Sequence, residues 1–366
     1  MKYKLLDLLT EYKETNKDSL YEPVAVGKYG IRKRNEIYKK ELSDDYSKNK
    51  VIRNNTLIVG MGSNQIDIGV LSDDEIYSVS PAYHTYRINI QVVGSDYLDL
   101  LFKANNANYF RKYSIATARQ GKKIDLKSLL NEIVNIPSFE EQGIIVGKIF
   151  DINELIRIEE KSLSLLDELT KSRFIEMFVN HNYSKTSIRS LVEITKVSAK
   201  KRYSGTDKFE YIDISSIDNS SHEVISSTTY TISNAPSRAQ QCLKTNDILV
   251  STVRPNLKNI ALFRGNNDGF VGSSGFCVLR AKNCNPAYLL YNVLTDEFTG
   301  SMVRLTTGAS YPAVRDDDVL DFQIYDVPIH LQNKFANFVE QVDKLKFSRS
   351  VENYTIFNQH RGGICA

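Results

Sequence analysis

The strongest constraint on the fold is an internal repeat: the second half of the sequence follows the order of features in the first half. The strand-like run at 56–59 precedes GMGSNQ, and the run at 247–250 precedes STVRPN. The segment YSVSPAYHTYR (77–87) aligns with FVGSSGFCVLR (270–280), and Tyr97-Leu98 recurs as Tyr288-Leu289, 191 residues later. Because this period is too long for a solenoid, it predicts two copies of one domain-plus-helix unit.

The back part of each copy has a glycine turn, a proline and a glutamine in the same order. A glycine turn at Gly121 (ARQGKKIDL) is matched by one at Gly308 (TTGASYPAV). Ile136-Pro137 and Val327-Pro328 then each open a helical stretch that carries a glutamine, Gln142 or Gln332. The shared order over almost the whole chain is a stronger signal than any one of these pairs.

Within each copy, the front part reads as strands and turns, and the back part reads as helix. Short β-branched runs such as TLIVG, DILVSTV and FCVLRA are separated by Gly, Asn, Asp and Pro. Ser138 and Glu141 have the spacing of a helix capping box. Apolar residues then recur in alternating steps of four and three, at 145, 149, 152, 156, 163 and 166, with Glu159 filling the slot between 156 and 163. A second apolar stripe adds 155, 158, 165 and 169.

A helix over residues 138 to about 178 would be roughly 60 Å long at about 1.5 Å per residue. Such a helix needs a partner for its stripe, and Phe335, Phe338, Val342 and Leu345 offer one. A helix packed on its own domain is the alternative. The predicted fold class is therefore α+β: two mixed α/β domains with short strands, separated by long antiparallel, coiled-coil-like helices.

Composition sets only loose limits. Charged residues make up 25% and the net charge is +3, so the totals alone do not indicate nucleic acid. None of the cysteines (Cys242, Cys277, Cys284 and Cys365) form a Cys-x-x-Cys pair, so we expect free thiols and no zinc site. The N-terminal segment has no long apolar run, and a cytoplasmic protein is expected.

The order of parts resembles the specificity subunit of type I restriction–modification systems. The resembling segments are GKKIDLKSLLNEIVNIP with IPSFEEQGIIVGKIFDINELI, and GASYPAVRDDDVLDFQIYDVPIHLQ, within a likeness that covers residues 1 to about 347. The resemblance implies two target-recognition domains, each reading half of a split site in double-stranded DNA. It also implies antiparallel spacer helices that dock two methyltransferase subunits, with restriction subunits joining that core. A non-catalytic chain in a DNA-modifying restriction system is expected, with no cofactor and no membrane partner.

The resemblance divides the chain into five segments. They are a first target-recognition domain at 1–137, a long spacer helix at 138–180, a second target-recognition domain at 181–327, a second spacer helix at 328–358 and a tail at 359–366. The heptad spacing is lost after Phe347, so the last helix is expected to be short or frayed.

A DNA reader needs phosphate contacts for affinity, and basic clusters supply candidates in both halves. The candidates are Lys28, Arg32, Lys33, Arg34, Arg119, Lys122 and Lys123 in the first half, and Lys200, Lys201 and Arg202 in the second. Solvated surface faces are the alternative interpretation of each cluster. Their presence in both halves favours DNA.

Specificity needs side chains that reach base edges, and polar loops at matched positions of the repeat supply these. Asn and Gln can pair with adenine in the major groove, and Arg or Lys with guanine. The candidates are Ser63, Asn64 and Gln65 in the first half, and Arg254, Asn256 and Lys258 in the second, with Arg238 and Gln240 in a further loop. Hairpin loops without a partner are the alternative.

Two rival functions stay open. Asn285-Pro286-Ala287-Tyr288 resembles the Asn-Pro-Pro-Tyr loop of adenine methyltransferases, but no Gly-rich strand–helix turn accompanies it. A helix N-cap followed by proline explains it better, and Asp316-Asp317-Asp318 is explained as the first turn of a short helix. The other rival is a two-armed protein-interaction scaffold without a DNA role. The chain lacks a Walker A sequence, and its histidines have no ligand-like spacing.

Overall fold

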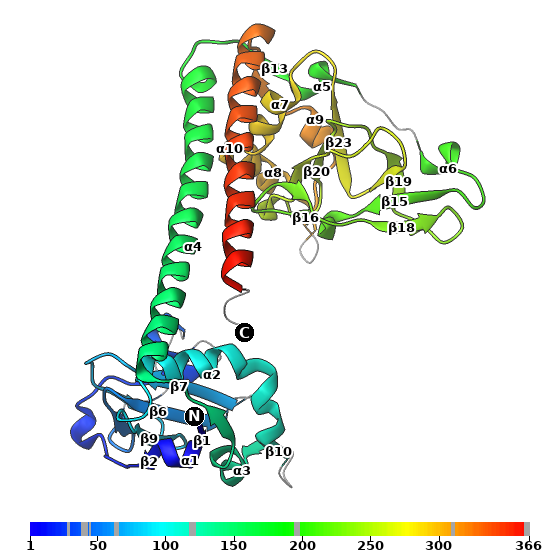
Figure 1. Ribbon diagram of the computed structural model, residues 1–366. Coiled ribbons are helices and arrows are strands. Elements are labelled where there is room, and N and C mark those ends of the chain that lie inside the picture. The colour runs from blue at the N-terminus through cyan, green and yellow to red at the C-terminus, as the bar shows by residue number, and fades with distance from the viewer. Residues whose placement is uncertain are drawn as a thin grey trace. The chain divides into compact units, whose positions relative to one another are not determined.

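The computed structural model describes residues 1–27, 30–37, 43, 45–61, 66–116, 122–193, 198–308 and 312–361. The chain forms two compact units, 1–157 and 158–366, which are described separately (Figure 1). The unit boundary falls inside the long helix α4 (Phe139–Phe174).

Unit 1 is built of short strands with one longer helix. Its elements before α4 are β1 (Lys2–Lys4), α1 (Leu5–Leu8), β2 (Leu9–Glu11), β3 (Val24–Gly27), β4 (Gly30–Lys33), β5 (Lys50–Ile52), β6 (Thr56–Met61), β7 (Ile66–Leu71), β8 (Tyr77–Val79), β9 (His84–Ile88), α2 (Ser95–Tyr109), β10 (Ser114–Ala116), β11 (Lys122–Ile124), α3 (Leu126–Leu130) and β12 (Ile133–Asn135), with 3-10 turns η1 (Lys17–Ser19), η2 (Arg34–Glu36) and η3 (Phe110–Tyr113).

Unit 2 has the same texture with more strands and more short helices. After α4 and the π-helical turn η4 (Ile175–Val179) come β13 (Lys185–Ser187), α5 (Ile188–Leu191), β14 (Val192–Glu193), α6 (Ala199–Arg202), β15 (Lys208–Ile212), η5 (Ile214–Ser216), β16 (Ile217–Asp218), β17 (Glu223–Val224), β18 (Thr228–Thr231), β19 (Ala239–Cys242), β20 (Ile248–Ser251), η6 (Pro255–Leu257), β21 (Ile260–Leu262), β22 (Phe270–Ser273), β23 (Phe276–Ala281), α7 (Pro286–Val293), α8 (Asp296–Leu305), α9 (Asp316–Leu320), β24 (Gln323–Tyr325) and α10 (Ile329–Arg361).

The repeat read from the sequence is present as a repeated sheet. Unit 1 has a four-stranded sheet in the order β2-β9-β6-β7, and unit 2 has one in the order β14-β23-β20-β21. The ladders agree with the sequence alignment, because Leu57 pairs with Tyr86 and its counterpart Ile248 pairs with Leu279. A two-stranded antiparallel pair also recurs, as β1-β12 and β13-β24. The prediction of two copies of one unit is confirmed at this level.

A buried glutamine fixes the start of each long helix to its own unit. Oε1 of Gln142 accepts from the Gly94 N–H at 2.8 Å, and Oε1 of Gln332 accepts from the Asn285 N–H at 2.8 Å. Each Nε2 donates to the carbonyl five residues earlier, Pro137 or Val327. Because the two glutamines are equivalent, their acceptors Pro137 and Val327 are equivalent as well. The alignment of Pro137 with Pro328 from the sequence is therefore wrong by one residue.

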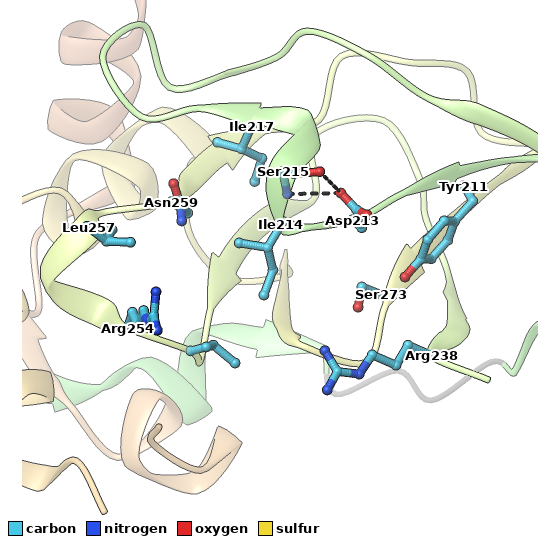
Figure 2. Close-up of a pocket in the computed structure, with 11 residues that line it drawn as sticks. Tyr211, Asp213, Ile214, Ser215, Ile217, Arg238, Arg254, Leu257, Asn259 and Ser273 are labelled. Atoms are coloured by element: carbon cyan, nitrogen blue, oxygen red, sulfur yellow. Dashed lines mark hydrogen bonds between the residues drawn. The ribbon is translucent and has the colours of Figure 1, made fainter. Parts of the chain in front are cut away.

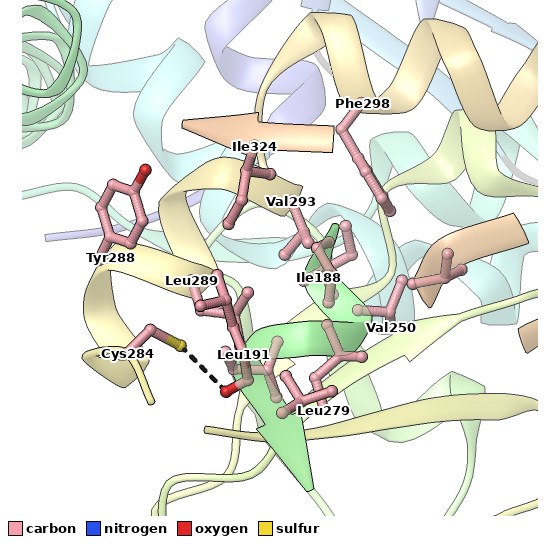
Figure 3. Close-up of a cluster of buried hydrophobic side chains, with 14 of the residues drawn as sticks. Ile188, Leu191, Val250, Leu279, Cys284, Tyr288, Leu289, Val293, Phe298 and Ile324 are labelled. Carbon is pink, nitrogen blue, oxygen red and sulfur yellow. Dashed lines mark hydrogen bonds between the residues drawn. The ribbon is translucent and has the colours of Figure 1, made fainter. Parts of the chain in front are cut away.

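The core of unit 2 gathers side chains from elements far apart in the sequence (Figure 3). Figure 3 shows Tyr288, Leu289 and Val293 of α7 beside Ile188 of α5 and Val250 of β20. Phe174 and Phe178, at the end of α4 and in η4, reach the same core and contact Phe335 of α10 with ring centroids 5.5 and 5.4 Å apart. Aromatic burial thus joins the end of one long helix to the start of the other.

Within unit 2 the end of α4 and the helix α10 pair antiparallel (Figure 1). Lys346 contacts Asp167, and Arg349 contacts Ser162, so the partner number falls on one helix as it rises on the other. Arg349 Nη1 also lies 3.7 Å from Glu159 Oε2.

The predicted capping box at the start of α4 is confirmed, since the Ser138 N–H donates to Glu141 Oε2 at 2.8 Å.

The expected short or frayed last helix is a wrong prediction. Helix α10 continues past Phe347 to Arg361. The physical reason is that loss of an apolar stripe removes packing but introduces no helix breaker. Residues 348–361 contain no Pro and no Gly, and the first glycines follow at 362 and 363.

Candidate nucleic-acid interface

The loop predicted to read bases in the second half is a tight turn with strained backbone. It follows β20 and contains the 3-10 turn η6, which begins with Pro255. Arg254 and Lys258 flank η6 with φ values of 48° and 51°. This is the left-handed backbone region, which residues other than Gly, Asn and Asp rarely adopt. A non-glycine residue held there needs surrounding contacts that fix the backbone.

Contacts with three other segments fix this turn. The Arg254 N–H donates to the Pro312 carbonyl at 2.9 Å, and Asn219 Nδ2 donates to the Leu257 carbonyl at 3.0 Å. Lys258 Nζ lies 2.6 Å from Asp296 Oδ1, at the start of α8. The Lys258 ammonium lowers the pKa of the Asp296 carboxyl below its ordinary value. Lys258 was predicted to bind DNA, but its ammonium group makes this internal ion pair.

Arg254 shares an open hollow with Arg238 (Figure 2). The hollow has a volume of about 430 Å³ and lies between the 253–259 turn and elements of a second sheet, in the order β18-β15-β22-β19. Figure 2 shows Arg254, Leu257 and Asn259 on one side, Arg238, Ser273 and Tyr211 on the other, and Ile214 between them. Two predicted base readers that lie 16 residues apart, at 238 and 254, are thus brought to one site.

The hollow also contains a carboxylate. Asp213 Oδ1 accepts from the Ser215 N–H at 2.9 Å and from Ser215 Oγ at 2.7 Å (Figure 2). It also accepts from the Ser216 N–H at 3.2 Å. These bonds cap the turn η5 and fix the carboxylate. Its other oxygen, Oδ2, accepts no hydrogen bond from the residues that the structure describes.

The basic cluster of the second half lies next to the Arg238 loop. Lys200, Lys201 and Arg202 are exposed and form most of helix α6, which packs against β19. Ser198 bridges to Gln241 of that strand, and Arg202 forms an ion pair with Asp268. The structure therefore brings this cluster together with the loop that precedes β19.

Two glutamines near this loop donate side-chain hydrogen bonds to backbone carbonyls of their own unit. Gln240 Nε2 donates to the Ser237 carbonyl at 2.8 Å. Gln241 Nε2 donates to the carbonyls of Ser273 and Phe276, at 3.0 and 2.7 Å. Asn256 is exposed in the 253–259 turn.

The candidates of unit 1 are less concentrated. Arg32 and Lys33 are exposed on β4, and Lys33 lies 3.6 Å from Glu22 and over the ring of Tyr77. Arg34, in η2, lies over the ring of Tyr46 at 5.7 Å. Because β4 packs against β7, these three residues lie beside the repeated sheet.

Lys122 and Lys123 form the exposed start of β11, which pairs with β10 and contacts β6. Five other predicted residues lie outside the described residues: Lys28, Ser63, Asn64, Gln65 and Arg119. The matched base-reading loop of unit 1 is therefore not compared with the 253–259 turn.

Sequence reasoning missed several residues that line the hollow, namely Tyr211, Asp213, Asn259 and Ser273. Only Asp213 had a usable signal, because Asp-Ile-Ser-Ser is an Asx-type capping sequence that marks a turn after a strand. The other three become neighbours only when β15, β22 and the 253–259 turn come together.

The motifs that suggested an enzyme or a metal have structural roles. Asn285 Oδ1 accepts from the Ala287 N–H at 2.9 Å with Pro286 at the first helical position, which confirms the N-cap interpretation. Asp316, Asp317 and Asp318 form the first turn of α9, as predicted. No group of His, Cys, Asp and Glu among the described residues could hold a metal ion. Within the same ranges, no helix is long and apolar enough to cross a membrane.

The three cysteines in the described part of the chain, Cys242, Cys277 and Cys284, are free and buried. Burial raises the pKa of the Cys284 thiol to about 12, so that thiol stays protonated and unreactive. The fourth, Cys365, lies outside the described residues.

Comparison with known proteins finds similarity only among solved structures. No family model and no curated protein matches the chain. Over 99% of its length the chain is similar to the type I restriction–modification system S subunit from M. genitalium, with 13% identity, 94% coverage of that chain and a TM-score of 0.52.

Two further similar structures align over about half of this chain. One is the HsdS subunit from Thermoanaerobacter tengcongensis, with 28% identity, 49% of this chain, 46% of that chain and a TM-score of 0.41. The other comes from work on complex assembly and conformational transition of the type I R-M system, with 28% identity, 50% and 47% coverage and a TM-score of 0.40. The chain thus spans about half the length of these two relatives. The full-length similarity shows that this chain has the fold of a type I restriction–modification S subunit.

Proposed function

We propose that the chain is the non-catalytic specificity subunit of a type I restriction–modification enzyme, and that it reads a bipartite site in double-stranded DNA. The observation that carries the proposal is the repeated unit with unlike polar loops, within a fold shared along the chain with an S subunit. Two similar frameworks with different side chains at one end suit two different half-sites.

The five segments keep their proposed roles. Residues 1–137 and 181–327 are the two reading domains, 138–180 and 328–358 are spacer helices, and 359–366 is a tail. The basic residues of both units would contact phosphates. The polar loops at 63–65, 238–240 and 254–258 would contact base edges.

The long helices are proposed to dock methyltransferase subunits. Leu155, Ile158, Leu165 and Leu169 follow one stripe of α4, and their side chains are between 50% and 56% exposed. An apolar stripe that is continuous along one exposed helix face is the kind of surface that binds a partner. Restriction subunits would join the assembly of this chain with two methyltransferase subunits.

The test is to co-express the full chain with the methyltransferase of its host and to sequence the methylome. We expect a bipartite methylated motif with an unread gap, and a purified complex with one copy of this chain and two of the methyltransferase. Methyltransferase alone is the control and should give no such motif. Unchanged methylation without the chain, or no binding of the chain to any methyltransferase, would instead favour a scaffold without a DNA role.

A further inference from the structure

The 253–259 turn has a strained backbone that contacts from outside the turn must hold. Arg254 and Lys258 have φ values of 48° and 51°, and neither is a residue type that favours this region. Such residues persist only where their surroundings over-determine the backbone, and they cluster at ligand-binding sites. The residues that hold this turn are therefore candidates for a functional role of their own.

A second turn, at 218–222, holds the later half of the strained turn at two points. Asn219 Nδ2 donates to the Leu257 carbonyl at 3.0 Å. His222 Nδ1 lies 3.1 Å from the Ile260 carbonyl oxygen, and the ring nitrogen donates there because a carbonyl only accepts. The two carbonyls flank the point where the chain leaves η6 and enters β21, so these bonds fix that exit.

The 218–222 turn is itself held by internal hydrogen bonds. It joins β16 to β17, and both strands lie beside β21. The Asp218 carboxylate accepts from the Ser220 N–H at 3.0 Å and from Ser221 Oγ at 3.0 Å. The His222 N–H donates to the Asp218 carbonyl at 2.9 Å, and His222 has a φ of 58°. Its ring is therefore aimed by a backbone that these bonds fix.

The supported turn is a part of unit 2 that presents predicted base-reading side chains. Arg254 and Asn256 are exposed on it, and Leu257 lines the hollow (Figure 2). Asn219 and His222 are not among the residues that line the hollow, and their side chains donate to the backbone of this segment. The geometry thus separates side chains that the turn presents from side chains that hold it.

We propose that Asn219 and His222 are positioning residues for DNA reading by unit 2, which hold the 253–259 turn in the conformation that meets one half-site. A loop that is fixed before binding loses less conformational entropy on binding than a mobile one. Phosphate contacts made elsewhere in the chain do not depend on this turn, and they carry no sequence information. The inference rests on the proposed function, because it assigns determinants of specificity within that DNA-reading surface.

The test uses the full chain co-expressed and purified with its methyltransferase, as wild type, Asn219→Ala and His222→Asn. Asparagine tolerates the left-handed backbone at 222 but lacks the ring that reaches Ile260. Each variant should bind the site defined by the wild-type methylome about 2- to 10-fold more weakly, as expected for one lost hydrogen bond, and bind unrelated duplex as the wild type does. In the methylomes, both variants should relax the half-site that Asn256→Ala relaxes, and keep the other.

Asn283→Ala is the matched control for Asn219→Ala. Asn283 is also an exposed asparagine of unit 2, and its Nδ2 donates to the Ser190 carbonyl at 3.4 Å, which belongs to α5 and not to the supported turn. It should leave both half-sites unchanged. If Asn283→Ala weakens cognate binding as much as Asn219→Ala does, the effect is not positional and the inference is overturned.

Hydrogen exchange of the same complexes separates a loosened turn from an unfolded unit. The N–H groups of Leu257 and Lys258 donate to carbonyls within the turn. Asn219→Ala and His222→Asn should speed exchange at these two amides and leave the amides of β20 as in the wild type. This pattern, together with relaxation of one half-site, is the result that supports positioning.

Other results overturn the inference. Faster exchange in the turn without a change in either half-site would show that reading does not need the support, and so would variants that behave as the wild type in both measurements. Relaxation of both half-sites together would show a general loss of binding. If His222→Asn also loosens β20, Asn219→Ala alone decides, because its hydrogen bond is exposed. A wild type without bipartite methylation overturns the proposed function itself.

Discussion

The two units share a sheet and differ in what is built beside it. The orders β2-β9-β6-β7 and β14-β23-β20-β21 match strand for strand, and Leu98 and Leu289 are fully buried at equivalent positions. Unit 2 adds the mixed sheet β18-β15-β22-β19. Its strand β22 supplies Ser273 to the hollow, and the residues next to β15 and β19 supply Asp213 and Arg238. In unit 1, the described residues form the pairs β3-β4 and β5-β8 instead. The framework is thus constrained by burial, whereas the added elements are free to diverge, as two different half-sites would require under the proposed function.

Even within the shared sheet, the two units place different buried polar residues at one matched position. The alignment places Thr56 opposite Asp247 and Arg87 opposite Arg280. In unit 2, Asp247 is fully buried and accepts from Arg280 at 2.8 and 2.7 Å. In unit 1, Thr56 is a buried hydroxyl, and Arg87 lies over the ring of Tyr12 at 4.9 Å. The fold requires a satisfied polar group at this position, not a particular pair.

The largest expected effect concerns the helix that belongs to both units. Inserting two residues after Asp151 of α4 should abolish methylation, because the insertion turns the following helix by more than half a turn. Inserting four residues, about 6 Å and close to one turn, should keep both half-sequences and add one or two unread base pairs. Methylome sequencing of the co-expressed variants measures the gap. A four-residue insertion that stays active with an unchanged gap would show that α4 is a tether.

The second prediction is that matched alanine variants lower the stability of the two units by different amounts. Asp247→Ala leaves the Arg280 guanidinium nearly buried without its partner, so it should destabilise unit 2 by about 3–5 kcal/mol. Thr56→Ala at the matched position removes one hydroxyl and should cost about 1 kcal/mol. Hydrogen exchange in the full chain, read separately for each unit, measures both.

The control is the double variant Asp247→Ala, Arg280→Met, which removes the charge together with its partner. It should recover most of the stability lost by Asp247→Ala alone. Equal losses from Asp247→Ala and Thr56→Ala would show that the buried ion pair does not distinguish the two units.

The sequence predicted those parts of the fold that depend on local pattern. The 191-residue offset places Leu57 opposite Ile248, and the capping signals at Ser138 and Asn285 mark true helix starts. The hollow could not be predicted, because Asp213, Arg238 and Arg254 become neighbours only through pairing between distant strands. Likewise, the Lys258–Asp296 ion pair joins residues 38 positions apart, and no local pattern marks it.

A third effect should be equal in the two units. Gln142 and Gln332 are each 3% exposed and hold the start of a long helix by hydrogen bonds to partly buried backbone groups. Replacing either by Ala leaves these groups unsatisfied and should cost about 1–3 kcal/mol in its own unit. Hydrogen exchange at Gly94 and Asn285 measures the local loss. A large loss in only one unit would mean that the repeat has kept the glutamine but not its role.

The smallest effect is a pH dependence of stability that both units should share. Burial lowers the pKa of His84 and of His222 below the ordinary value. Around His222, Lys171 and Lys258 lower the pKa further, while Asp167 and the Ile260 carbonyl, 3.1 Å from Nδ1, raise it. Because the folded pKa lies below the unfolded one, near 6.5, the unfolded state takes up its proton first. Stability is therefore complete above that pH and falls as the pH drops through it.

His222→Asn tests this in unit 2, because asparagine tolerates the left-handed backbone at 222, where φ is 58°. His84→Gln is the matched change in unit 1, on β9. Each variant should flatten the loss of protection between pH 7.5 and 5.5, roughly a one-unit range on either side of the unperturbed histidine pKa, in its own unit alone. Comparing each variant with the wild type removes the contribution of the carboxylates, because both proteins contain them and they titrate at lower pH. An unchanged slope in both variants would place the acid sensitivity outside these histidines, and a change in the other unit would show that the two units do not titrate independently.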